Sequence, residues 1–115
     1  MKENNGLRRV VVTGIGTVTP LGLSSEENWR NLIQGKSGIG PISLFDASEF
    51  PVRIAGEVTG FDFESWKKRK PLLNLAGRST FFALQAAREA IQDARLVREA
   101  EDPERMGLYF AAGDW

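Results

Sequence analysis

The hydrophobic residues fall into short uninterrupted runs and into segments with helical spacing, which predicts alternating strands and helices. Residues 10–12 are three consecutive valines, and such a β-branched run without polar alternation is typical of an inner strand covered on both faces of a parallel sheet. A second apolar run, at residues 106–112, predicts another inner strand. The run at residues 52–58 follows Pro51, which favours a strand at a sheet edge.

Two helices are predicted. The first covers about residues 25–34, because Ser24 and Glu27 form a capping-box pattern and Gly35 provides a C-terminal stop. The second covers roughly residues 77–95, where small apolar residues share one side and polar residues the other. The apolar stripes contain Trp29, Leu32 and Ile33 in the first helix and Phe82, Ala83, Ala86, Ala87, Ala90, Ile91 and Ala94 in the second, opposite Arg88, Glu89, Gln92 and Asp93.

The order of these elements is strand, helix, edge strand, helix, strand, with a long loop predicted at residues 36–50 and a turn at residues 102–104. This order of elements is typical of the start of an α/β sandwich. Parallel sheets rarely stop at two inner strands, because both faces and both edges then need cover. We therefore expect the opening section of something larger, or a small domain that a partner completes. Large exposed apolar patches should cause self-association or partner-dependent folding.

Composition removes several classes of chemistry. The 115 residues include 15 basic and 15 acidic side chains, with no histidine and no cysteine. Zero net charge argues against a binder of nucleic acid or of an anionic membrane. The missing residues exclude thiolate nucleophiles, imidazole bases, disulfides and ordinary zinc sites within this sequence. Because no secretory signal or membrane-spanning run is evident, a cytoplasmic location is expected.

Two glycine motifs suggest nucleotide binding only weakly. Gly14 and Gly16 follow a predicted strand, but Thr19 occupies the third glycine position and no helix begins directly afterwards. A Gly-Lys-Ser triplet begins at Gly35, but it follows a helix instead of a strand. No G-x-S-x-G elbow is present, and a serine relay lacks its histidine. We therefore expect no cofactor and no metal, and interpret Glu57, Asp62 and Glu64 as separate surface groups.

A basic stretch at residues 66–71 (WKKRKP) has two interpretations. It could dock an acidic partner, or it could be a solvated turn before the second helix. Four like charges without a wider basic face favour the solvated turn.

Four blocks of sequence together resemble the opening of the β-ketoacyl-[acyl carrier protein] synthases, the condensing enzymes of the thiolase fold, and most closely the type II elongating synthase. The blocks are RRVVVTGIGTVTPLG at residues 8–22, GKSGIGPISLFDASEFPVRIAGEV at 35–58, ALQAAREAIQDA at 83–94 and DPERMGLYFAAG at 102–113, with the Trp29 helix between the first two. Their order and spacing cover nearly the whole chain.

The resemblance implies a thiolase-like α/β fold, with residues 1–115 as the N-terminal portion of one α/β/α/β/α layered half. It also implies acyl carrier protein and acyl or malonyl thioesters as partners, and an assembly with itself or with a partner subunit. The family's nucleophile is a cysteine, assisted by two histidines that help form the carbanion and stabilise the oxyanion. All three lie downstream of the matched region, so no catalytic residue is assigned here and the chain alone should be inactive.

Two departures from the family pattern bear on substrate. Residues 74–79 keep only Arg78 from the second half of the usual R-R-M-D-R-F segment. A small-residue loop normally approaches the acyl pocket after the last strand, and the corresponding wall here is Ala112, Gly113 and Asp114. An unpaired buried carboxylate costs several kcal/mol. The alternatives are a synthase for short or unusual acyl groups and a non-catalytic subunit similar to a chain-length factor.

Overall fold

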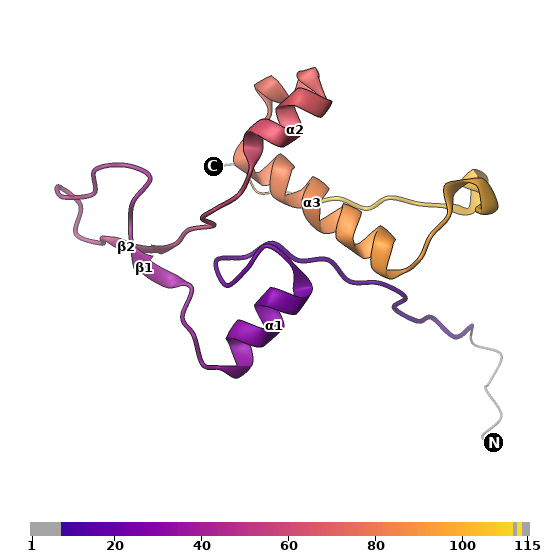
Figure 1. Cartoon of the computed structure of the whole chain (residues 1–115), viewed down its shortest axis with the longest axis horizontal. Helices are drawn as coiled ribbons and strands as arrows, with labels where there is room; N and C mark the ends of the chain where they lie inside the picture. Colours follow the sequence, from indigo (N-terminus) through magenta and orange to yellow (C-terminus); the bar gives the residue numbers. More distant parts are fainter. Residues whose placement is uncertain (1–7, 112, 114–115) are drawn as a thin grey trace.

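The computed structural model describes residues 8–111 and 113 (Figure 1). Its helices and strands are short, and they are joined by extended segments. In chain order they are α1 (Ser25–Ile33), β1 (Ile39–Pro41), β2 (Ile54–Gly56), α2 (Phe63–Arg69), the 3₁₀ turn η1 (Pro71–Leu75), α3 (Arg78–Asp93), and the 3₁₀ turns η2 (Arg98–Ala100) and η3 (Pro103–Arg105).

Both ends of α1 are determined by its own residues, and the helix predicted at about residues 25–34 is confirmed. The Ser24 hydroxyl accepts a hydrogen bond from the Glu27 amide at 3.2 Å, as the capping box requires. The Glu27 carboxylate reaches back one residue further than predicted, to the Leu23 amide at 2.8 Å. At the other end, Gly35 has a positive φ of 66° and forms a Schellman cap with Lys36.

The helix predicted at residues 77–95 is confirmed as α3, and an extended N-terminal segment lies along it. Figure 1 shows this segment, in indigo, passing between α1 and α3. A Cβ atom added at Gly16 would overlap the Ala86 carbonyl oxygen, and one at Gly14 would overlap that of Ala90. The alanine face of α3 and these two glycines therefore permit a close approach of the two backbones.

Two carboxylates of α3 accept hydrogen bonds from backbone amides of the extended N-terminal segment and of α1. Glu89 accepts hydrogen bonds from the Thr17 amide at 3.0 Å and from the Ser25 amide at 2.7 Å. Asp93 accepts one from the Ile15 amide at 2.9 Å. The amide of residue 25 belongs to the first turn of α1, so Glu89 connects three parts of the chain.

An aromatic junction joins the first turns of α2 and α3. Phe81 is 2% exposed and lies edge-on to Phe63, with ring centroids 5.3 Å apart. Phe61 contacts the Phe63 ring at 4.7 Å. The Arg78 guanidinium lies 4.8 Å from the centre of the Phe63 ring and donates a hydrogen bond to the Val58 carbonyl at 2.9 Å. Aromatic edge contacts and a cation over a ring both stabilise this arrangement.

The strands that the structure forms are not those expected for a parallel sheet. β1 and β2 pair antiparallel, with Gly40 opposite Ala55. β2 lies within the predicted edge strand at residues 52–58, whereas β1 lies in a segment predicted to be loop. The carboxylate of Glu57, directly after β2, accepts hydrogen bonds from the backbone amide and hydroxyl of Ser43 in the loop that connects the two strands. The loop that connects β1 to β2 is longer than the two-residue turns by which a hairpin is most easily predicted from sequence.

Both predicted inner strands are corrected by the structure. Residues 8–18 and residues 106–111 form no strand, and residue 112 lies outside the described part. The reason is physical, because an isolated strand has no partner for its amide and carbonyl groups, and neither segment pairs with another described segment. The predicted turn at residues 102–104 is present in η3, which the Asp102 side chain caps.

The expected exposure of apolar surface is confirmed. Val10 is 93% exposed and Tyr109 is 99% exposed, whereas the buried apolar core of the described residues contains only Ala47 and Phe81. Two buried apolar side chains form a very small core, and a chain that buries little apolar surface gains little stability from it. Self-association and partner-dependent folding remain predictions.

Candidate functional site

The carboxylates interpreted as separate surface groups each serve a local structural contact. Glu57 binds the loop at Ser43, and the Ser43 hydroxyl is the main cause that lowers the Glu57 pKa. Asp62 accepts a hydrogen bond from the Ser65 amide at 2.9 Å and caps α2. Glu64 forms an ion pair with Lys67 at 2.9 Å, one helical turn away. The three do not form an acid–base pair, which agrees with the prediction.

The glycines considered for nucleotide binding have structural roles instead. Gly14 and Gly16 face the backbone of α3, where any side chain would clash. Gly35 caps α1 in the left-handed conformation. Among the residues that the structure describes, no group of three or more acidic side chains could hold a metal ion.

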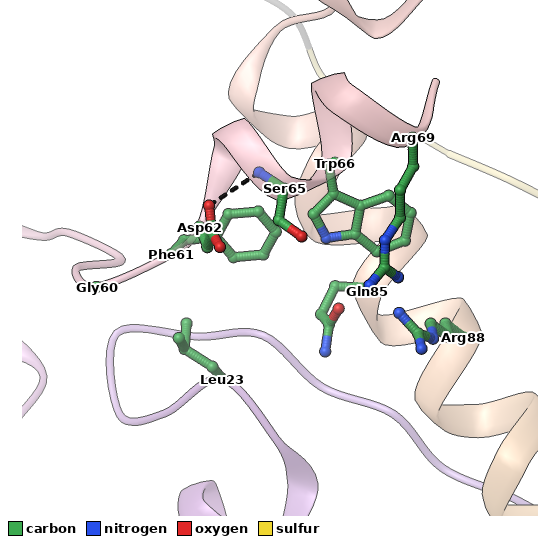
Figure 2. Close-up of a pocket in the computed structure, with 9 residues that line it drawn as sticks. All are labelled: Leu23, Gly60, Phe61, Asp62, Ser65, Trp66, Arg69, Gln85 and Arg88. Carbon is green, nitrogen blue, oxygen red and sulfur yellow. Dashed lines mark hydrogen bonds between the residues drawn. The ribbon is translucent and has the colours of Figure 1, made fainter. Parts of the chain in front are cut away.

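A polar hollow of about 260 Å³ lies between α2, α3 and the loops that precede α1 and α2. Figure 2 shows that α2 lies above it, the loop with Leu23 lies below it, and α3 forms the remaining side. The lining residues are Leu23, Gly60, Phe61, Asp62, Ser65, Trp66, Arg69, Gln85 and Arg88.

The charged groups of this hollow are separated into two ends. Arg69 from α2 and Arg88 from α3 extend toward each other beside Gln85, whereas Asp62 lies at the opposite end (Figure 2). Within residues 8–111 and 113, the single ion pair joins Glu64 and Lys67, so neither guanidinium has a described carboxylate partner. One end of the hollow is therefore positively charged.

The basic stretch at residues 66–71, which the sequence predicted to be a solvated turn, is mainly helical. It forms the end of α2 and its C-terminal cap, with Lys67, Lys68 and Arg69 in the last helical turn. Positive side chains at this end of a helix interact favourably with its dipole. The sequence did not reveal that Arg69 and Arg88 share one hollow. The available signals were the basic stretch itself and one arginine on the polar side of the following helix.

A second hollow, of about 530 Å³, lies between α1 and the extended segment before it, and its lining is mainly apolar. Its apolar lining residues are Trp29 and Leu32 from α1 and Ile15 and Leu21 from the extended segment. The buried Thr17 hydroxyl has no hydrogen-bond partner among the described residues. Trp29 and Leu32 in this lining are also among the exposed large apolar residues.

The pocket wall predicted at Ala112, Gly113 and Asp114 is not tested by the structure. Ala112 and Asp114 lie outside the described residues, and Gly113 is exposed. Among the described residues, no helix is both long enough and apolar enough to cross a membrane.

Comparisons with known proteins identify relatives along nearly the entire chain. The family model described as "Beta-ketoacyl synthase, N-terminal domain" matches residues 7–114. A 3-oxoacyl-[acyl-carrier-protein] synthase 2 from Synechocystis sp. is 40% identical over 92% of this chain and 25% of its own length. The tetracenomycin polyketide synthase ketoacyl synthase beta subunit of Streptomyces glaucescens is 44% identical over 90% of this chain and 25% of its own length.

A solved structure shares both fold and sequence with this chain. It is titled "The ishigamide ketosynthase/chain length factor", and it matches with a TM-score of 0.69 and 39% identity over 80% of this chain and 23% of its own. The chain therefore spans about a quarter of the length of the relatives that it matches.

Proposed function

The chain belongs to the β-ketoacyl synthase family through the N-terminal domain that it matches, and on this premise we propose that it supplies the N-terminal segment of a synthase for fatty acid or polyketide chain elongation. The observation that carries this proposal is the match over residues 7–114, together with a ketosynthase structure of the same fold. In such a protein this segment provides scaffold and pocket wall.

The proposed reaction joins an acyl group to a malonyl thioester held on acyl carrier protein. A cysteine thiolate holds the acyl group as a thioester, and decarboxylation of the malonyl group releases CO₂ and leaves a carbanion equivalent. This carbon attacks the acyl carbonyl, a carbon–carbon bond forms, and the cysteine thiolate leaves. The 115 residues contain neither cysteine nor histidine, so the nucleophile and the oxyanion-stabilising groups come from outside this sequence.

Ala112, Gly113 and Asp114 form part of the acyl pocket wall in this proposal. A carboxylate beside an acyl tail would oppose long apolar chains, since burying it without a partner is costly. The proposed substrate is therefore a short or unusual acyl group. In the complete synthase, Asp114→Gly should extend the range of products toward longer acyl chains. The distribution of product chain lengths measures this effect.

Acyl carrier protein is the proposed partner, and relatives of this chain bear its name. The exposed end of α2, with Lys68 and Lys70, offers positive charge to an acidic protein surface. We place the working protein in the cytoplasm, assembled with itself or with a partner subunit.

A second candidate function is that of a non-catalytic subunit similar to a chain-length factor. Two observations favour it, namely the 44% identity to a ketoacyl synthase beta subunit and the ketosynthase/chain length factor structure. Here the chain would shape the product of a complete partner subunit instead of condensing acyl groups.

A chimeric enzyme distinguishes the two candidates. The N-terminal quarter of the Synechocystis synthase, which is 40% identical, is replaced by this chain, so that the remainder of the relative supplies cysteine and histidines. We expect ketoacyl product from acyl and malonyl thioesters of acyl carrier protein. The parental synthase and a chimera without the nucleophilic cysteine are the controls.

A chimera that folds cooperatively but forms no product would contradict the synthase proposal and favour the non-catalytic subunit. Product formation by the isolated 115-residue chain would contradict the assignment of the nucleophile to another part of the protein.

A further inference from the structure

We propose that the hollow between α2 and α3 binds a phosphate group, held between the guanidinium groups of Arg69 and Arg88. The proposal rests on Arg69 and Arg88, which are not residues of the predicted acyl pocket wall. The ligand is a small molecule bearing a phosphate dianion, whether inorganic phosphate or a phosphate ester.

The first argument is the unbalanced charge at one end of the hollow. Two exposed arginines from different helices extend toward each other (Figure 2), and neither has a carboxylate partner within the described residues. Two like charges that face one hollow repel each other, and an anion between them converts this repulsion into attraction. The single lining carboxylate, Asp62, lies at the other end and is already hydrogen-bonded to the Ser65 amide.

The second argument is the match of charge and donor geometry. Each guanidinium is a planar fork that binds phosphate oxygens through two parallel hydrogen bonds. A phosphate group carries about −1.5 to −2 charge near neutral pH and has three strong acceptor oxygens, so it can engage both forks at once. A single carboxylate has two oxygens and is satisfied by one fork. The amide of Gln85 lies beside both guanidiniums and adds further donors (Figure 2).

The third argument concerns access and size. Arg69 and Arg88 are both exposed, so a ligand can enter from water without a rearrangement of the helices. The hollow of about 260 Å³ also extends past the arginines toward Ser65 and Asp62. These groups can accept or donate hydrogen bonds to hydroxyl groups of a phosphate ester, which inorganic phosphate cannot use.

The experiment measures phosphate binding to the full chain by calorimetry at constant ionic strength, with chloride as the balancing anion. Inorganic phosphate and glycerol phosphate are the two probes. We expect saturable binding of both. Tighter binding of glycerol phosphate would indicate that the ligand is an ester, and equal binding would indicate free phosphate.

Three charge-neutralising variants test the site. Arg69→Gln and Arg88→Gln should each weaken binding about tenfold or more, since each removes charged hydrogen bonds to the anion. Arg30→Gln is the matched control, because it removes the same guanidinium charge from an exposed position of α1 that does not line the hollow. It should change affinity less than about twofold.

A fluorescence measurement locates the bound anion independently. Trp66 lines the hollow beside Arg69 (Figure 2), so phosphate should change its emission. Trp66→Phe should remove this change while calorimetric binding persists. The proposal is overturned if no saturable binding occurs at millimolar phosphate, or if Arg30→Gln weakens binding as much as Arg88→Gln does. Because no acyl thioester is present, this result is independent of the condensation assay.

Discussion

The aromatic junction between α2 and α3 and the apolar run at residues 106–111 are both rich in hydrophobic side chains, but their burial differs completely. Phe81 at the junction is 2% exposed, whereas Tyr109 in the run is 99% exposed. The junction forms because its helices satisfy their own backbone groups before they meet. The run requires neighbouring strands for the same purpose. Hydrophobicity alone therefore does not bury a segment whose backbone partners lie elsewhere.

The largest expected effect comes from removing the buried ring. Phe81→Ala should destabilise the full chain by about 3–5 kcal/mol, because it leaves a cavity beside the rings of Phe61 and Phe63. Denaturant unfolding followed by helical circular dichroism measures this loss. Tyr109→Ala is the contrasting variant, and it should change stability by less than about 0.5 kcal/mol. Equal losses for both variants would show that the run at residues 106–111 is packed in solution.

The next largest effect concerns the close approach of the N-terminal segment to α3. Gly16→Ala should cost about 1–3 kcal/mol, because the added methyl group would overlap the carbonyl oxygen of Ala86. Gly40→Ala is a suitable control, since an added Cβ there meets no atom within 4 Å. The difference in unfolding midpoint between these two variants measures the contact. If the midpoints agree, the segment is not seated on α3.

A smaller effect, in the stabilising direction, is expected at the end of α3. Arg95 has a positive φ of 53°, and its amide donates to the Gln92 carbonyl at 3.0 Å. This is the position where helices favour glycine. Arg95→Gly should therefore raise stability by roughly 0.5–1 kcal/mol, whereas Arg95→Ala should not. Thermal melts of the two variants provide the comparison, and destabilisation by glycine would contradict the left-handed cap.

The smallest effect is a local dependence on pH at the loop between β1 and β2. Hydrogen bonds, chiefly from the Ser43 hydroxyl, lower the Glu57 pKa from its ordinary value of 4.5. Because the folded pKa is the lower one, the stabilisation is complete above about pH 4.5 and is lost as pH falls through the folded value. The amide chemical shift of Ser43 should follow this titration. Glu57→Gln should abolish it, and an unchanged titration in that variant would assign it to another group.

The same contrast between local and distant partners explains how far the sequence predicted the fold. The predicted limits of α1 and α3 agree with the structure to within about two residues, because Ser24, Gly35 and the alanine stripe act within one helix. The inner strands were wrong because strand pairing depends on segments far away in sequence. β1 was not predicted, because glycine and proline, which occupy positions 40 and 41, are common in loops.

The candidate site shows a similar limit. α3 was predicted in outline, and so was the positive charge of residues 66–71, whereas the helix α2 was not predicted. The meeting of Arg69 with Arg88 depends on the turn η1 (Pro71–Leu75) and on the packing of Phe63 against Phe81. Neither has a periodic pattern that specifies the angle between the two helices. The family was identified from the sequence because it depends on ordered blocks, whereas the site depends on geometry.

The carboxylates of Glu89 and Asp93 have a consequence for association between molecules. They occupy the amides of Thr17 and Ile15, which are alternate residues and so belong to one edge of the extended segment. An edge whose donors are already bound offers no template for an added strand from another molecule. This short stretch is thereby protected against edge-to-edge aggregation, even though strongly apolar residues precede it.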